Sequence, residues 1–320
     1  MGGTRPQRRI AADDRGIAEV VRQLKAGGIA AVPTETVYGL AADAANPAAV
    51  ARVFRAKGRP AANPLIVHVA NREMAARYAE IPPLADRLMA RFWPGPLTLV
   101  LPRRADAPLT GAVTAGLPTV ALRAPDHPVM QAVIRGLGRG VAAPSANVSG
   151  RLSPTRPEHV AELAVPLVLD AGPCRLGLES SVVKVEEDRL VLLRPGSLDS
   201  ATLAEAAGVP VELAGAGAKE APEAPGTAFR HYAPRLPLDL DVTEAAAGRF
   251  LLGFGPVPGD LNLSPAGDVA EAAANLFAAL YRAETSGAER IGVAPIPAEG
   301  AGIAIRDRLQ RAAAASRDRP

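Results

Sequence analysis

The chain has 320 residues, of which 48% are hydrophobic and 22% charged, so wholesale disorder is excluded. Its length is about twice that of a common single domain, and we expect two domains. The net charge of +3 excludes a densely cationic nucleic-acid binder, and the single cysteine, Cys174, excludes an intramolecular disulfide and a multi-thiolate metal site.

The N-terminal stretch from Arg5 to Arg9 is basic, and we expect a solvated tail there, with RNA contact as the alternative. Residues 1–25 lack the apolar segment of a signal peptide. No run of about twenty apolar residues occurs in the sequence, as a membrane span would need. We therefore expect a soluble, cytoplasmic protein with no membrane partner.

Apolar residues at helical spacing predict a first helix that starts after Asp13 and Asp14 and ends at Gly27. The apolar run 29–32 predicts a buried strand, and Thr34–Leu40 predicts a functional loop after it. Whole helices separate several of the later strands, which predicts a mixed α/β sheet. The further strands are expected at 65–69, 97–101, 119–122, 141–143, 165–169 and 182–185, and the helices at 47–56, 83–92 and 127–137.

Small residues and prolines dominate residues 207–237, which predicts a linker. Strands expected at 250–254 and 291–296 and helices at 269–282 and 303–315 then predict a second, smaller α/β unit. The predicted organisation is a catalytic domain at 1–206, a linker at 207–237 and a small domain at 238–320.

Two pairs of polar residues have the spacing of a phosphate site. Lys57 and Arg59 lie two residues apart, and in an extended segment both would face one polyanion, although cations at a helix C-terminus would explain them equally. Ser145 and Asn147 follow a predicted strand, where a loop can turn backbone N–H groups toward phosphate, or simply form an ordinary turn.

Single polar residues also lie at predicted strand ends. Arg123 follows one strand, and its guanidinium could pair with a carboxylate. The hydroxyls of Ser180 and Ser181 precede another strand, and Arg194 ends the next, which are positions where ligands bind in α/β folds. The sequence contains none of the motifs GxxxxGK[ST], GxSxG and HExxH, no GxGxxG after the first strand, and no metal-ligand pattern among its four histidines.

Six motifs occur in order along the chain: Pro33–Leu40, Lys57–Pro60, Asn63–Leu65, Phe92–Thr98, Pro144–Gly150 and Arg194–Gly196. Together they closely resemble the YrdC-like threonylcarbamoyl-AMP synthase family, and residues 224–234 are similar to the linker of its longer members. The resemblance implies a YrdC-like twisted open mixed sheet with helices, plus a smaller Rossmann-like α/β domain at the C-terminus.

The resemblance implies that L-threonine, bicarbonate and ATP, with Mg²⁺, give L-threonylcarbamoyl-AMP and pyrophosphate. The product would serve the formation of N6-threonylcarbamoyladenosine at position 37 of tRNA. A tRNA threonylcarbamoyl transferase complex would then be a transient partner, and tRNA an indirect one. The Mg²⁺ ligands, the oligomeric state and the role of the small domain do not follow from it.

The family's functional positions transfer to this sequence by motif. Those that imply catalysis are Lys57, Arg59, Ser145 and Asn147. Those that imply L-threonine binding are Thr34, His68, Arg123, Ser145 and Ser181. Those that imply ATP binding are Lys57, Asn63, Thr119, Ser153, Arg194 and Tyr232. In the linker, Arg230, His231 and Tyr232 are expected to form a lid over the nucleotide.

Two other functions fit part of the pattern. An RNA-binding module could use a positive cleft of the same fold, although the small net charge and an aromatic content of 3% disfavour it. A carbamoyl-transferring maturation enzyme could contain a YrdC-like unit within a larger chain, although the sequence lacks its zinc-finger-type cysteine spacing.

Overall fold

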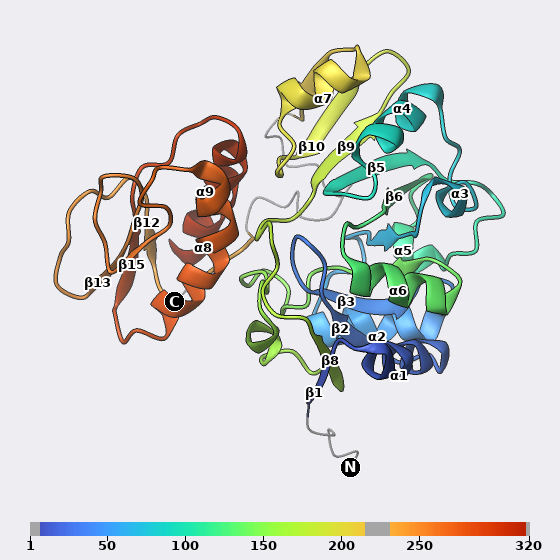
Figure 1. The fold of residues 1–320 in the computed structure, drawn as a ribbon, viewed down its shortest axis with the longest axis horizontal. Helices are drawn as coiled ribbons and strands as arrows, with labels where there is room; N and C mark the ends of the chain where they lie inside the picture. Colours follow the sequence, from blue (N-terminus) through green and yellow to red (C-terminus); the bar gives the residue numbers. More distant parts are fainter. Residues whose placement is uncertain (1–6, 215–230, 318–320) are drawn as a thin grey trace.

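The computed structural model describes residues 7–214 and 231–317, which form two sheets with helices (Figure 1). Within these residues the larger sheet has eleven strands, both parallel and antiparallel. Their order across the sheet is β1 (Arg8–Ala11), β8 (Leu167–Asp170), β2 (Ala30–Val32), β3 (Gly39–Asp43), β7 (Val141–Ala142), β4 (Ile66–His68), β6 (Thr119–Arg123), β5 (Leu97–Pro102), β9 (Ser181–Val185), β10 (Leu190–Arg194) and β11 (Val211–Leu213).

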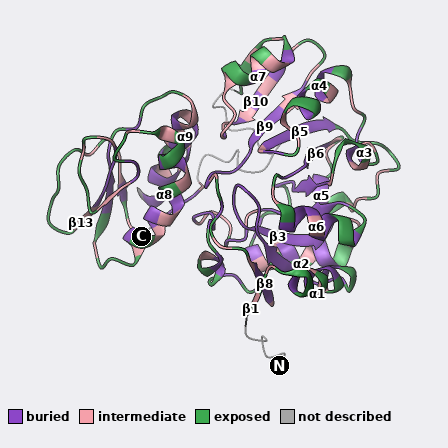
Figure 2. Ribbon diagram, viewed as in Figure 1, coloured by how far each residue is buried: buried purple, intermediate pink, exposed green. Residues whose placement is uncertain are grey.

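Helices pack on this sheet through buried apolar side chains on either face (Figure 2). They are α1 (Asp14–Lys25), α2 (Pro47–Lys57), α3 (Arg72–Ala75), α4 (Pro83–Phe92), α5 (Gly111–Thr114), α6 (Pro128–Leu137), the 3-10 helix η1 (Pro157–Val160) and α7 (Ser200–Ala207). Local signals set their ends: the Asp13 side chain accepts from Gly16 N at 2.8 Å and caps α1, as predicted. Gly58, with φ 58°, ends α2 in the left-handed conformation.

The second sheet is parallel and has the order β12 (Leu238–Asp239), β15 (Arg290–Val293), β13 (Arg249–Gly253) and β14 (Leu261–Asn262). Helices α8 (Val269–Glu284) and α9 (Ala301–Arg317) lie between this sheet and the larger one (Figure 1). The Tyr281 hydroxyl of α8 donates to the Leu152 carbonyl at 3.0 Å across the boundary. The predicted fold class, a mixed sheet plus a smaller α/β unit, is confirmed.

Three short strands lie where the sequence predicted irregular chain. Strand β1 includes Arg8 and Arg9 of the expected solvated tail, pairs with β8, and has its cations bound to Glu19 and Asp170. Strand β3 begins inside the expected loop 34–40, and β11 lies inside the expected linker 207–237. Among the described residues, no helix is long and apolar enough to cross a membrane.

Candidate active site

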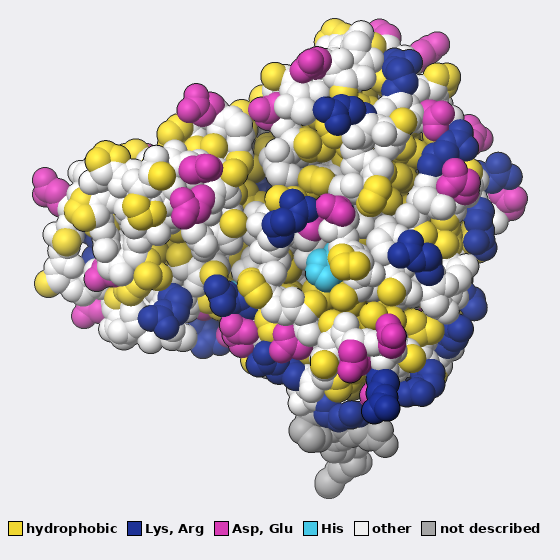
Figure 3. Space-filling view, in the orientation of Figure 1, with side chains coloured by type: hydrophobic (Ala, Val, Ile, Leu, Met, Phe, Trp, Pro, Cys, Tyr) yellow, Lys and Arg dark blue, Asp and Glu magenta, His cyan; other side chains and the backbone are white. Residues whose placement is uncertain are grey.

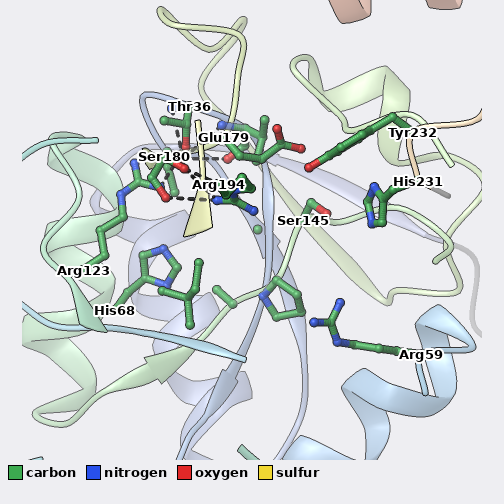
Figure 4. Close-up of a pocket in the computed structure, with 16 residues that line it drawn as sticks. Thr36, Arg59, His68, Arg123, Ser145, Glu179, Ser180, Arg194, His231 and Tyr232 are labelled. Carbon is green, nitrogen blue, oxygen red and sulfur yellow. Dashed lines mark hydrogen bonds between the residues drawn. The ribbon is translucent and has the colours of Figure 1, made fainter. Parts of the chain in front are cut away.

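Strand ends and loops of the larger sheet surround a pocket, a place where α/β folds commonly bind small molecules. Its walls come from segments far apart in the sequence, which the crossed strand order brings together (Figure 4). The lining residues are Thr34, Thr36, Val37, Gly39, Arg59, Ile66, His68, Arg123, Ala143, Pro144, Ser145, Glu179, Ser180, Arg194, His231 and Tyr232.

At one end of this cavity Arg123, the last residue of β6, is 3% exposed. Its Nη1 donates to Thr36 Oγ1 at 3.0 Å, its Nε donates to the Gly95 carbonyl at 3.2 Å, and its Nη2 lies 2.6 Å from Glu35 Oε1. A guanidinium fixed in this way can bind a small carboxylate.

His68, at the end of the neighbouring strand β4, lies beside Arg123 (Figure 4). Burial, and then the charge of Arg123, lowers the pKa of His68 to about 3, so the ring is neutral at neutral pH. Its buried Nδ1 has no hydrogen-bond partner among the described residues. This nitrogen is therefore available to a polar group of a ligand.

Cations also line the rest of the cavity. Arg194, at the end of β10, donates from Nη2 to the Ser180 carbonyl at 2.9 Å and to Ser180 Oγ at 3.2 Å. Arg59 donates to Asn63 Oδ1 at 2.6 Å and to the Pro64 carbonyl at 2.8 Å. Burial, and then the charge of Arg194, lowers the pKa of Arg59 to about 10, which leaves it protonated at neutral pH. This wall is suited to a polyanion.

Lys57 lies behind the cavity wall rather than in it. Its Nζ donates to the backbone carbonyls of Ser145 at 2.5 Å and Asn147 at 2.6 Å, so it fixes the loop from which Ser145 faces the cavity. The expectation that Lys57 and Arg59 share one face is wrong, because Lys57 is still helical and Gly58 turns the chain between them. Burial, and then the charge of Arg59, lowers the pKa of Lys57 well below its usual value.

His231 and Tyr232 close the cavity near Arg59 and Ser145 (Figure 4). Burial lowers the pKa of His231 to about 3, with smaller contributions from Lys57, Arg59 and Arg194. The Tyr232 hydroxyl is buried without a hydrogen-bond partner among the described residues. Its backbone has a φ of 62°, a left-handed conformation that is rare for a bulky residue.

The structure brings most of the predicted site residues together. Those that line the cavity are Thr34, Arg59, His68, Arg123, Ser145, Arg194, His231 and Tyr232. Four others support the lining from behind. Lys57 of α2 binds the carbonyls of Ser145 and Asn147, Asn63 accepts a hydrogen bond from Arg59, and Ser153 donates one to Glu179.

Two predicted residues lie elsewhere, and a third is outside the described part of the chain. The Ser181 hydroxyl bonds to the Leu198 carbonyl at 2.7 Å, and it is the neighbouring Ser180 that lines the cavity. Thr119 lies at the opposite end of β6 from Arg123 and is not among the lining residues, so its contact with ATP stays a prediction. Arg230 lies outside the described residues.

The predicted site residues did not include Glu35, Thr36 and Glu179. Glu35 and Thr36 belong to the motif 33–40, and Glu179 directly precedes Ser180 and Ser181. Their closeness to predicted site residues in the sequence could have identified them. In the structure Glu179 is the carboxylate of the lining, and Thr36 and Glu35 contact Arg123.

Comparison with known proteins gives consistent matches along the chain. A family model described as "Telomere recombination" matches residues 22–196, and one described as "Threonylcarbamoyl-AMP synthase, C-terminal domain" matches residues 198–314. The threonylcarbamoyl-AMP synthase of Pyrococcus abyssi is 39% identical over 314 residues, covering 90% of this chain and 91% of the relative. That of Bacillus subtilis is 44% identical over 236 residues, covering 72% and 68%.

Solved structures show the same likeness. The crystal structure of P. abyssi Sua5 complexed with L-threonine matches with a TM-score of 0.88 and 36% identity, covering 97% of this chain and 98% of that one. E. coli YciO, at 22% identity and a TM-score of 0.55, covers 62% of this chain and shares the fold alone.

Proposed function

Since this chain belongs to the threonylcarbamoyl-AMP synthase family, we infer that it joins L-threonine, bicarbonate and ATP into L-threonylcarbamoyl-AMP, with pyrophosphate as the second product. The adenylate is the precursor of N6-threonylcarbamoyladenosine in tRNA. The observation that carries the assignment to this cavity is the presence of Arg123 at one end and of Arg59 and Arg194 along the rest.

L-threonine is proposed to bind at the Arg123 end. A relative of this chain has been solved with L-threonine, and Arg123 and His68 offer a cation for the carboxylate and a neutral ring nitrogen for a polar group. Thr34 and Ser145 line the same cavity and can contact the hydroxyl. Ser180 takes the position expected for Ser181.

ATP is proposed to bind along the wall of Arg59 and Arg194, with its Mg²⁺ carried by the triphosphate. Phosphate oxygens and water are ligands that Mg²⁺ prefers. Glu179, the carboxylate of this wall, is already bound by Ser153 and Arg308. His231 and Tyr232, which line the cavity at this end, are proposed to cover the nucleotide as a lid.

In the proposed reaction bicarbonate takes up a proton and loses water to give CO2. The neutral threonine amine then bonds to the carbon of CO2 and releases a proton, which gives a carbamate and restores the proton used. A carbamate oxygen then bonds to the α-phosphorus as the bond to the pyrophosphate oxygen breaks. The protein aligns the two substrates and stabilises phosphoryl charge with Arg59 and Arg194. Ser145, held by Lys57, lies between the two ends. A labile carbamate also favours a site closed to water.

The assignment is tested by incubating the protein with L-threonine, bicarbonate, ATP and Mg²⁺ and detecting the adenylate and pyrophosphate by mass spectrometry. Omission of bicarbonate and replacement of L-threonine by L-valine are the controls, because valine has the shape without the hydroxyl. ATP turnover that is independent of L-threonine would contradict the assignment.

The RNA-binding alternative predicts affinity that falls steeply with salt. On the face shown in Figure 3, basic side chains follow the lower right edge and lie among acidic ones elsewhere. We propose that tRNA and the transferase complex receive the product, and that any contact with them is transient. We also propose that the reaction takes place in the cytoplasm.

A further inference from the structure

Arg308 of α9 reaches from the smaller α/β unit into the wall of the cavity. It is 1% exposed, and its Nε donates to Glu179 Oε2 at 3.0 Å while its Nη2 donates to the Pro195 carbonyl at 2.9 Å. Its Nη1 donates to Asp307 on the same helix at 2.7 Å. A fully desolvated guanidinium with three directed hydrogen bonds is fixed in position.

These partners belong to the nucleotide end of the cavity. Glu179 lines it, and Pro195 directly follows Arg194, which also lines it. The guanidinium carbon of Arg308 lies 5.2 Å from the centre of the Tyr232 ring, within the range of a cation–π contact. One side chain therefore touches three separate segments of this wall.

Arg308 compensates the negative charge of Glu179 in the cavity wall. Burial by itself would raise the pKa of Glu179, but the charges of Arg308 and Arg194 and the Ser153 hydrogen bond lower it to about 2, so it carries a full negative charge. Without Arg308, this carboxylate would face a triphosphate uncompensated or would pair with Arg194. Either result removes positive charge from the wall on which the phosphates are proposed to lie.

We propose that Arg308 is a positioning residue of the active site, through which the smaller α/β unit neutralises Glu179 and holds Tyr232 at the nucleotide end. The proposal rests on the proposed function for the identity of the nucleotide. It gives the smaller unit a role in ATP binding rather than in L-threonine binding, because Arg308 bonds to Glu179 and the Pro195 carbonyl and lies over Tyr232, all at the nucleotide end.

The test compares Arg308→Met with Arg306→Met. Arg306 is on the same helix, but its Nη1 donates to the Ile296 carbonyl of the smaller unit at 2.9 Å. Arg308→Met should raise KM for ATP about 30- to 100-fold, the lower part of the range for removing one partner of a buried charge pair, and change KM for L-threonine less than about threefold. Arg306→Met should change neither. Equal losses for both substrates in Arg308→Met would overturn the proposal.

A double-mutant cycle with Glu179→Gln separates charge compensation from general packing. If Arg308 acts by neutralising Glu179, its replacement should raise KM for ATP much less in the Glu179→Gln background. The same fold-change in both backgrounds would overturn the proposal. Thermal unfolding of each variant identifies a folding failure, and in that case Arg308→Gln, which keeps a hydrogen-bond donor but not the charge, replaces Arg308→Met throughout.

Failure of the proposed function is distinguishable from failure of this proposal. The first appears as absence of the adenylate with the unaltered protein. Calorimetric titration with ATP and Mg²⁺ does not depend on turnover, so it can still compare the ATP affinity of Arg308→Met with that of the unaltered protein. Equal affinities in that titration would overturn the role of Arg308 alone.

Discussion

The guanidinium of Arg123 and the carboxylate of Glu35 lie 2.6 Å apart, with side chains 4% and 1% exposed. Neither Glu35 oxygen nor Arg123 Nη2 has a well-aligned hydrogen bond among the described residues. The contact is therefore an ion pair without the two parallel hydrogen bonds of a bidentate arginine–carboxylate pair. Glu35 thus balances a buried charge while the guanidinium keeps donor capacity for a second carboxylate.

Replacement of Arg123 by Lys should weaken L-threonine binding. Lys keeps a cation beside Glu35 but lacks the fixed fork, so we expect Kd for L-threonine to rise roughly 10- to 100-fold while Kd for ATP changes little. Calorimetric titration measures both constants. Arg103→Met is the control, because Arg103 is exposed. Equal weakening of both ligands would argue against an amino-acid site at Arg123.

Replacement of Arg59 by Met should reduce adenylate formation. Removing one cation that stabilises phosphoryl charge costs about 10²- to 10³-fold in rate, and we expect kcat/KM for ATP to fall by that factor. The matched control is Arg55→Met, since Arg55 is exposed in the last turn of α2. Pyrophosphate release at fixed L-threonine and bicarbonate gives the comparison, and similar rates for the two variants would place the triphosphate elsewhere.

Stability should fall as the pH drops below about 6.5, partly through His68. The folded protein holds its pKa near 3, whereas the unfolded chain restores it to about 6.5, so only the unfolded chain gains a proton in this window. His68→Gln should remove up to about 2 kcal/mol of the difference in unfolding free energy between pH 6.5 and pH 5. Urea unfolding at both pH values measures it. An unchanged difference in the variant would show that His68 does not contribute.

Replacement of Gly196 by Ala should destabilise the protein. A Cβ at this position would lie 2.2 Å from Ser181 N and 2.6 Å from Ser180 C, both backbone atoms. We expect a loss of about 1–3 kcal/mol in unfolding free energy, as for other overpacked sites. Gly111→Ala is the control, because a Cβ there meets nothing within 4 Å. Equal stability of the two variants would contradict the close packing of Gly196, just after β10, on the backbone at the start of β9.

Much of the fold could be predicted because its longer elements have clear periodicity and end signals. Helix α4 occupies the predicted residues 83–92, and α1 begins at the predicted cap. The strands missed are β1, β3, β11, β12 and β14, because segments that are very short, charged or rich in small residues carry little strand signal. Pairing with distant partners stabilises them, and one sequence does not reveal those partners.

The motifs predicted most of the site residues, but they did not predict which way each side chain points. Adjacent serines at the start of a strand point to opposite sides, so choosing between Ser180 and Ser181 requires the register of β9. Arg308 gave no signal at all, because it is 129 residues from Glu179 in the sequence and lies in a helix of alanines and charged residues.

The Glu179–Arg308 pair also constrains how such chains can be recombined. A chimaera that joined the larger sheet of this protein to the C-terminal unit of another would bury an uncompensated anion unless the incoming helix supplied a cation at the same place. The two units are therefore expected to be exchangeable only as a matched set.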